Sequence, residues 1–166
     1  MADNMTIRPV AETDCGAITE IYNHYITDTT VSFEVEPVSA EDMLGRIRIV
    51  SARFPYLVIE ERGRVAGYCY VHPWKERAAY CHTFELTIYL DRSCRGRGLG
   101  SKLLAEVIKE CRTLNVCHSL IACITAENSE SIAFHSRHGF EQVSSFREVG
   151  RKFGRWLDVV DMQLML

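Results

Sequence analysis

The chain has 166 residues, which is enough for one domain and too few for two of ordinary size. Hydrophobic residues make up 47% of it and charged residues 25%, proportions typical of a soluble protein with a sizeable core. The net charge of −3 and the lack of a basic stripe argue against a general nucleic-acid binder, and no apolar run is long enough to cross a membrane.

The cysteines indicate the redox compartment. There are seven, no Cys-x-x-Cys pair occurs, and the N-terminus lacks the apolar core of a signal peptide. We therefore expect reduced thiols in a cytoplasmic protein. No pair of cysteines has the spacing of zinc ligands, so we expect no metal site.

The first part of the chain predicts a strand at 5–10 and then a helix that Asp14 can cap. Apolar residues recur in this helix at intervals of three and four, which predicts one buried face: Ile18, Ile21, Tyr22 and Tyr25. Residues 29–34 are polar, β-branched and aromatic and predict a loop. Within it, Phe33 could either fill the core or form a wall of a binding pocket.

The next part predicts a second helix, two paired strands and a third strand. Ser39-x-x-Asp42 is typical of a helix start, and Pro55 ends that helix. Residues 56–60 and 65–71 predict strands joined by a hairpin turn. An exposed loop follows at 72–77, and a long strand is predicted from about Tyr80 to Leu90.

Three glycines at alternate positions follow this strand: Gly96, Gly98 and Gly100. Helical spacing begins at Leu99, so the glycines lie in a strand-to-helix turn where backbone N–H groups can approach a ligand closely. Three nearby arginines add positive charge: Arg92, Arg95 and Arg97. Such a turn is suited to phosphate, although its order matches neither a Walker A loop nor a dinucleotide fingerprint.

The rest of the chain predicts a central helix, a strand at 119–126 and another helix that ends at Gly139. Residues 119–126 form a nearly continuous apolar run, as expected of a central strand. Two last strands, 141–149 and 156–166, are predicted around 150–154. The alternation of strands and helices predicts a single mixed α/β domain over 1–166.

Two segments resemble those of the GCN5-related N-acetyltransferases (GNATs). Arg95-x-x-Gly98-x-Gly100 resembles the loop that binds the pyrophosphate of acetyl-coenzyme A, and Asn128-x-x-Ser131-x-x-Phe134-His135-x-x-x-Gly139-Phe140 resembles the second conserved block of the family. The order of predicted elements is also similar over nearly the whole chain. Five shorter segments in register resemble the subfamily that acetylates phosphinothricin and methionine sulfoximine: Asn23-His-Tyr25, Thr30-Val-Ser-Phe33, Pro73-Trp-Lys75, Gly98-Leu-Gly-Ser101 and Phe153-Gly-x-Trp156-x-Asp158.

The resemblance implies a GNAT fold, with a mixed central sheet flanked by helices. It also implies direct transfer of acetyl from acetyl-CoA to the α-amino group of a small L-amino acid or analogue, without a metal, in a homodimer. The coenzyme would be held by the end of the long strand, the glycine loop and one asparagine: Ile88, Tyr89, Leu90, Arg95, Gly96, Arg97, Gly98, Leu99, Gly100, Ser101 and Asn128.

Acetyl transfer requires a neutral amine, and amines of this kind, with a pKa of about 8, are mostly charged at neutral pH. Glu85 is the candidate base, because it lies just before the coenzyme loop on the opposite pleat from Leu86. The alternative is a solvated glutamate on a half-buried strand. The leaving thiolate could take a proton from His135. This histidine could instead bind the coenzyme or a water at Glu85, or be structural.

Recognition of an amino acid requires a cation for its carboxylate. Lys75 and Arg77 precede the long strand, and arginine matches a carboxylate better. Phe33 and Tyr80 could line the pocket, and both cations could instead be solvated loop charges. The segment 152–156 could be a pocket lid or a dimer contact. The rival functions are a protein or peptide N-acetyltransferase and a non-catalytic acetyl-CoA-binding module.

Overall fold

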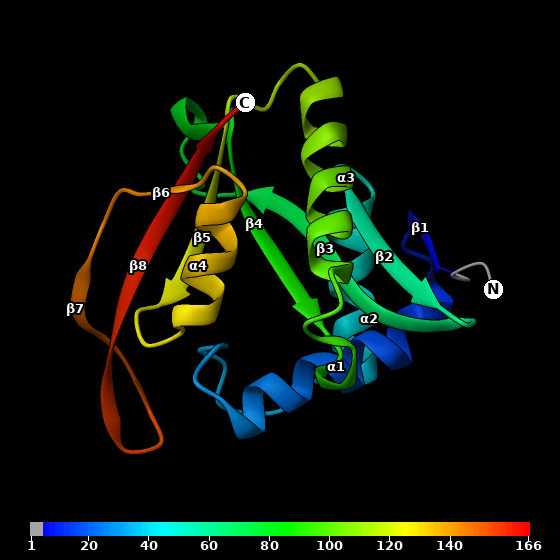
Figure 1. Ribbon diagram of the computed structural model, residues 1–166, viewed down its shortest axis with the longest axis horizontal. Helices are drawn as coiled ribbons and strands as arrows, with labels where there is room; N and C mark the ends of the chain where they lie inside the picture. The colour runs from blue at the N-terminus through cyan, green and yellow to red at the C-terminus, as the bar shows by residue number, and fades with distance from the viewer. Residues whose placement is uncertain (1–4) are drawn as a thin grey trace. The chain divides into compact units, whose positions relative to one another are not determined.

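The computed structural model describes residues 5–166 (Figure 1). The described chain forms two compact units. The first unit holds the chain up to Asn23 together with Val38–His72 and Thr87–Asn115. The second unit holds His24–Pro37, Pro73–Leu86 and Val116–Leu166.

The first unit contains strands in the order β1-β2-β3-β4, in which β2 runs antiparallel to both β1 and β3. These strands are β1 (Met5–Pro9), β2 (Tyr56–Glu61), β3 (Arg64–Pro73) and the last half of β4 (Thr83–Leu90). The predicted hairpin between β2 and β3 is confirmed: Arg62 and Gly63 both have positive φ, 53° and 76°. Gly67 on β3 allows close packing, since a Cβ there would overlap the side chain of Leu90.

Helices cover both faces of β2. Four successive residues of this strand, Tyr56 to Ile59, are buried, although a strand covered on one face would alternate. Two helices of the unit pack against it, α2 (Ala40–Ser51) and α3 (Leu99–Thr113). The predicted start of α2 is confirmed, because the Ser39 side chain accepts a hydrogen bond from the backbone N–H of Asp42 at 3.1 Å.

The second unit is built on strands in the order β4-β5-β8-β6, with β7 also paired to β8. The first half of β4 runs parallel to β5 (Ser119–Thr125), and β8 (Arg155–Met165) runs antiparallel to β5. The long β8 also pairs with the short strand β6 (Glu141–Gln142) and with β7 (Phe146–Lys152). Helix α4 (Ser129–Arg137) contacts β5. Figure 1 shows β7 and β8 as a long hairpin.

Eight strands and four α-helices are thus described, and the predicted mixed α/β fold is confirmed. Helix α1 (Cys15–Asp28) has the predicted buried stripe, with Ile18, Ile21 and Tyr25 buried. Gly139 has a φ of 86° directly after α4, as a helix-ending glycine should.

Three local predictions are wrong. The strand predicted from Tyr80 begins only at Thr83, since residues 78–80 form a single 3-10 turn. The strand predicted at 141–149 is split into β6 and β7 at residues 143–145. Asp14 does not cap α1. Instead, its carboxylate accepts hydrogen bonds from the N–H of Ala11 and from Arg8, both at 2.8 Å, so it fixes the chain before the helix.

Candidate active site

The glycine loop in the first unit joins β4 to α3. Gly96 and Gly98 have positive φ angles of 72° and 78°, a backbone conformation that residues with a Cβ rarely adopt. Gly98 is the N-cap residue of α3 and has no side chain to satisfy the N–H groups of the first turn. Asp91 braces the other end of the loop, since its carboxylate accepts a hydrogen bond from the N–H of Ser93 at 2.8 Å. The loop therefore presents an uncapped helix N-terminus, which favours an anion.

The sequence predicts that Arg97 binds the coenzyme, but in the structure its side chain binds a carboxylate of the protein. Its guanidinium binds both carboxylate oxygens of Glu61 on β2, with one N–O distance of 2.7 Å and a second, shorter contact. This hydrogen bonding lowers the pKa of Glu61. In this conformation, Arg97 anchors the loop to β2. Phosphate binding by Arg97 would require it to share or leave this carboxylate.

The other predicted coenzyme residues lie at the end of β4 and the start of α3. Tyr89 packs edge-on against Tyr22, with ring centroids 5.2 Å apart, and lies at 5.7 Å from Tyr68. Its ring therefore belongs to an aromatic cluster, and its backbone is what it can offer to a ligand. Leu99 and Gly100 are buried, whereas Arg95, Gly96 and Gly98 are exposed and Ile88, Leu90 and Ser101 are half-buried.

Glu85 lies in the second unit, on one face of the sheet. Its neighbours Phe84 and Leu86 are buried on the opposite face, as the pleat requires. Glu85 itself is half-buried, and its strand partner on β5 is Ile121. Two residues beyond Ile121, and so on the same face as Glu85, lies Cys123.

Cys123 is held as a neutral thiol. Its Sγ lies 3.0 Å from Oδ1 of Asp161 and donates a hydrogen bond to that carboxylate. Burial, this hydrogen bond and the negative charges of Glu85 and Asp161 all raise the pKa of the Cys123 thiol. A thiolate nucleophile is therefore disfavoured at this position. Sequence reasoning missed Asp161 and Cys123, because only the strand register aligns them with Glu85.

His135 on α4 is buried, with 3% of its surface exposed. Its Nδ1 lies 2.8 Å from the backbone oxygen of Ser131. A carbonyl oxygen can only accept, so Nδ1 carries the proton and Nε2 has a free lone pair. Within residues 5–166, Nε2 is the single buried side-chain nitrogen or oxygen without a hydrogen-bond partner. Burial lowers the pKa of His135, which favours this neutral form.

Asn128 caps α4, the helix that carries His135. Its Oδ1 accepts a hydrogen bond from the N–H of Ser131 at 3.2 Å. Asn128, which the sequence predicts to bind the coenzyme, therefore has a structural role in this unit as the N-cap residue of α4.

In the second unit, three of the predicted acceptor-binding residues contact other residues of the protein: Phe33, Lys75 and Tyr80. The Lys75 ammonium lies 4.0 Å from the ring centroid of Trp74 and 5.2 Å from that of Tyr80, and the two rings meet edge to face. Phe33 is 42% exposed and its ring lies directly on Gly150 of β7, where a Cβ would overlap the ring. The structure thus brings Lys75 and Tyr80 together.

Arg77 stands apart from this aromatic group. Its side chain is exposed and makes no hydrogen bond or ion pair with any residue between 5 and 166. It is the residue immediately before the 3-10 turn at 78–80. Of the two predicted carboxylate-binding cations, Arg77 is therefore the one whose charged group no described protein group engages.

The sequence indicates 152–156 only as a segment and does not single out Lys152, which is buried. Lys152 is 5% exposed, and its Nζ donates to the backbone oxygen of Ser32 at 2.7 Å. Burial lowers its pKa, and the carboxylate of Glu34 opposes that shift. The contact fastens the loop that carries Phe33 to β7. No local pattern marks a lysine next to an exposed turn as buried.

Comparison with known proteins decides the family. A family model described as an acetyltransferase (GNAT) domain matches residues 7–160. The chain belongs to the GNAT acetyltransferase family. It is 39% identical to an L-methionine sulfoximine/L-methionine sulfone acetyltransferase of Salmonella typhimurium, over 98% of this chain and 95% of that protein. It is also 37% identical to the L-amino acid N-acyltransferase MnaT of Escherichia coli, over 98% of this chain and 94% of that protein.

Solved GNAT structures agree with this assignment. An acetyltransferase from Salmonella typhimurium, determined with acetyl-CoA, superposes with a TM-score of 0.95 at 38% identity and covers 98% of this chain and 94% of that one. A phosphinothricin acetyltransferase of the GNAT superfamily from Sinorhizobium meliloti, in complex with acetyl-CoA, gives a TM-score of 0.93 at 36% identity, covering 98% and 89%. The predicted family and fold are therefore confirmed.

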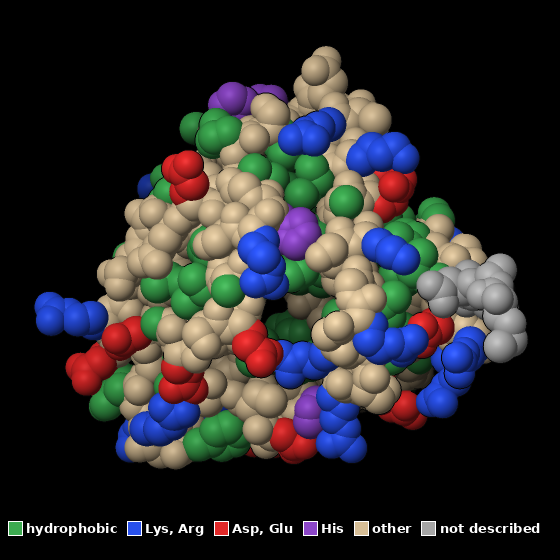
Figure 2. Space-filling view, in the orientation of Figure 1, with side chains coloured by type: hydrophobic (Ala, Val, Ile, Leu, Met, Phe, Trp, Pro, Cys, Tyr) green, Lys and Arg blue, Asp and Glu red, His purple; other side chains and the backbone are tan. Residues whose placement is uncertain are grey.

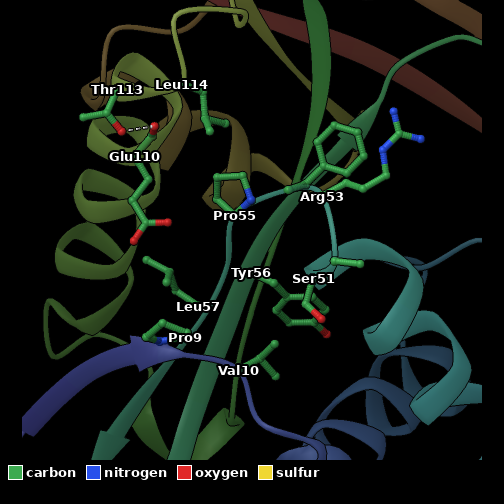
Figure 3. A pocket seen from close by; sticks show the side chains of 12 residues that line it. Pro9, Val10, Ser51, Arg53, Pro55, Tyr56, Leu57, Glu110, Thr113 and Leu114 are labelled. Atoms are coloured by element: carbon green, nitrogen blue, oxygen red, sulfur yellow. Dashed lines mark hydrogen bonds between the residues drawn. The ribbon is translucent and has the colours of Figure 1, made fainter.

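A cavity of this GNAT chain lies away from the glycine loop. It has a volume of about 560 Å³ in the first unit (Figure 3). Glu110, Thr113 and Leu114 line it, so it lies at the C-terminal end of α3, whereas the loop lies at the N-terminal end. A helix of 15 residues separates the two by roughly 22 Å. None of the predicted site residues lines this cavity.

No group of three or more His, Cys, Asp or Glu residues between 5 and 166 could hold a metal ion. Over the same residues, no helix is long and apolar enough to cross a membrane. On the face shown in Figure 2, Lys and Arg side chains are interspersed with Asp and Glu.

Proposed function

We propose that residues 1–166 act as one acetyltransferase domain that moves acetyl from acetyl-CoA to the α-amino group of a small L-amino acid or analogue. The observation that carries this proposal is the similarity, over nearly the full chain, to proteins named for such acceptors. Relatives named for methionine sulfoximine, methionine sulfone or phosphinothricin are 34–39% identical over 92–98% of this chain.

Acetyl-CoA is proposed as the co-substrate, and it supplies the activated acetyl thioester. The uncapped N-terminus of α3 and the glycine loop suit its pyrophosphate, because they offer backbone N–H donors and positive φ without side chains. Arg95 would add charge. The backbone of Ile88, Tyr89 and Leu90 would pair with the extended arm of the coenzyme and supply an N–H donor to the oxyanion.

Glu85 is proposed as the general base. A half-buried carboxylate on an open sheet face can accept a proton from the acceptor ammonium, directly or through water. The neutral amine then attacks the thioester carbonyl, the C–S bond breaks so that the coenzyme leaves as a thiolate, and the new amide nitrogen gives its extra proton to that thiolate or to water. We propose direct transfer, because Cys123, the thiol nearest to Glu85 in the register, is stabilised in its protonated form.

His135 is proposed as a hydrogen-bond acceptor for the bound ligand. The single proton of the neutral ring is engaged at Ser131, so Nε2 has a lone pair and no proton to give. A general-acid role would need a second proton on a buried ring, which burial disfavours. An N–H, O–H or S–H group of the coenzyme, the acceptor or a water at Glu85 would satisfy Nε2.

Arg77 is proposed to bind the acceptor carboxylate, because its guanidinium has no other described partner. Lys75 is engaged over Trp74 and would contribute charge at longer range. Phe33 and Tyr80 would line the pocket. Replacement of Arg77 by alanine should raise the KM for amino acids about tenfold or more, and leave the KM for acetyl-CoA unchanged.

The protein is further proposed to be a cytoplasmic homodimer that joins through the hairpin of β7 and β8. Four large apolar side chains of this hairpin are 47–59% exposed: Phe146, Val149, Phe153 and Trp156. Among the described strands, β7 pairs with β8 alone, so its other edge is open to a second chain. Exposed apolar groups on an edge strand favour burial against a partner.

An acetylation screen tests the main proposal. The purified protein is incubated with acetyl-CoA and with amino acids, their sulfone, sulfoximine and phosphinate analogues, simple amines and peptides, and thiol release is measured. Turnover with amino acids but not with the matching decarboxylated amines is expected. Preference for peptides would favour a protein N-acetyltransferase, and coenzyme binding without turnover of any acceptor would favour a binding module.

A further inference from the structure

Three polar side chains share one face of the sheet in the second unit. Glu85 on β4 is paired in register with Ile121, and Cys123 follows two residues later on β5. Cys123 is paired with Asp161 on β8. Every second side chain along a strand points to the same face, and so do the side chains of paired residues on neighbouring strands. Glu85, Cys123 and Asp161 therefore form a diagonal row on one face.

The row carries two negative charges with a neutral thiol between them. Cys123 donates a hydrogen bond to Asp161, with a distance of 3.0 Å between Sγ and Oδ1, and thereby holds that carboxylate in place. The charge of Glu85 acts on the same thiol, so both carboxylates lie within electrostatic range of one sulfur atom. Cys123 retains exposed surface on this face.

A small amino acid can span this row. Neighbouring strands are about 4.8 Å apart and residues rise about 3.3 Å along a strand, so the offset of two strands and two residues puts the Cα atoms of Glu85 and Asp161 about 12 Å apart. If the amine lies at Glu85, a side chain that extends across Cys123 ends at Asp161. The group at the tip of that side chain then meets a negative charge.

We propose that Asp161 is a specificity residue that selects acceptors by the charge at the tip of the side chain. This inference rests on the proposed function, with the amine at Glu85. A carboxylate accepts hydrogen bonds and repels anions. The site therefore favours methionine sulfoximine, whose side chain is neutral and carries an N–H donor, over methionine sulfone, which carries acceptors only. It disfavours phosphinothricin, whose phosphinate is an anion.

Relative acetylation rates test the inference. The ratio of kcat/KM for phosphinothricin to that for methionine sulfoximine is measured in the wild-type protein and in Asp161→Asn. Asn has the same shape without the charge, so this ratio should rise about tenfold. Changes in coenzyme binding or in overall activity cancel in the ratio. Glu141→Gln is the matched control: it removes one exposed charge on β6, which also pairs with β8, and should leave the ratio unchanged.

A second measurement needs no variant. In the wild-type protein, added salt screens the repulsion between Asp161 and the phosphinate, so the same ratio should rise with ionic strength. A ratio unchanged in Asp161→Asn and independent of salt would overturn the role of Asp161 and leave the acetyltransferase function standing, since the ratio can be measured only where acetyl transfer occurs. Failure of the wild-type protein to acetylate any of the three acceptors would overturn both proposals.

Discussion

At the scale of single residues, the proposed chemistry depends on Glu85. Glu85→Gln keeps the shape of the side chain but removes the proton acceptor. Turnover should fall by about 10²–10⁴-fold at neutral pH, as measured by release of coenzyme A thiol, and recover in part at high pH, where more of the amine is already neutral. Acetyl-CoA affinity, measured by calorimetry, should barely change. Full activity of this variant at neutral pH would show that another group or bulk water is the base.

His135 should also affect stability in acid. Burial lowers its pKa, so the unfolded chain binds this proton more tightly than the folded protein does. The free energy of unfolding should therefore decrease as the pH falls below about 6.5, the ordinary pKa of histidine. Denaturant titrations across this range should show a weaker pH dependence in His135→Gln.

The exposed His118 provides the control for His135. His118→Gln makes the same chemical change at an exposed position, so it separates the effect of burial at residue 135 from that of the substitution itself. An identical pH dependence in wild type and His135→Gln would contradict a lowered pKa at that position. The ¹⁵N chemical shifts of the imidazole should show the proton on Nδ1, as the contact with Ser131 requires.

At the scale of elements, the start of α3 carries the coenzyme prediction. Gly98 has a φ of 78° and no described atom lies within 4 Å of the position of a Cβ. Gly98→Val should therefore fold, at a cost in stability from its backbone conformation, but place a branched side chain where the pyrophosphate would approach. Calorimetry should show acetyl-CoA binding weakened at least about tenfold, as expected when phosphate loses close backbone contact.

A second glycine provides a matched control for that effect. Gly63, in the hairpin between β2 and β3, has a nearly identical φ of 76° and equally open surroundings. Gly63→Val should lose similar stability and keep its affinity for acetyl-CoA. Equal losses of affinity in both variants would mean that the loop acts through stability alone.

The elements also show where sequence reasoning succeeds. The hairpin turn, the cap of α2 and the end of α4 are local signals, and each is read correctly from a few adjacent residues. The turn before β4 is missed because Trp74, Lys75 and Tyr80 pack together, a tertiary contact that shortens the predicted strand. The split between β6 and β7 likewise depends on their pairing with β8.

Long-range pairing limits what could be predicted of the site. The glycine loop, Glu85 and His135 stand out from local pattern and family resemblance. The partner of Arg97 lies 36 residues earlier in the chain, and the partner of Cys123 lies 38 residues later. No periodicity in the sequence encodes these pairs. Neither the ion pair of Arg97 with Glu61 nor the row that ends at Asp161 could therefore be predicted without the structure.

At the scale of the whole molecule, the hairpin of β7 and β8 should control assembly. Trp156 is 58% exposed on that hairpin, and Trp156→Glu puts a charge into the proposed contact. Light scattering should show a dimer for the wild-type protein and a monomer for this variant, because the variant removes the large apolar surface of Trp156 from the contact and puts a charged group in its place. Ile49→Glu, at an even more exposed apolar residue on α2, should remain a dimer. A monomeric wild-type protein would contradict the assignment.

The contact between Phe33 and Gly150 has a consequence for how this part of the molecule can change in evolution. The Phe33 ring occupies the space where any other residue at 150 would put its first side-chain carbon. The two positions, far apart in the sequence, must therefore vary together: a homologue with alanine or a larger residue at 150 should carry a smaller side chain at 33. Residue 33 is a proposed wall of the acceptor pocket. A substitution at residue 150 on β7 can therefore change which acceptors fit, by acting through residue 33 rather than by contact with the substrate.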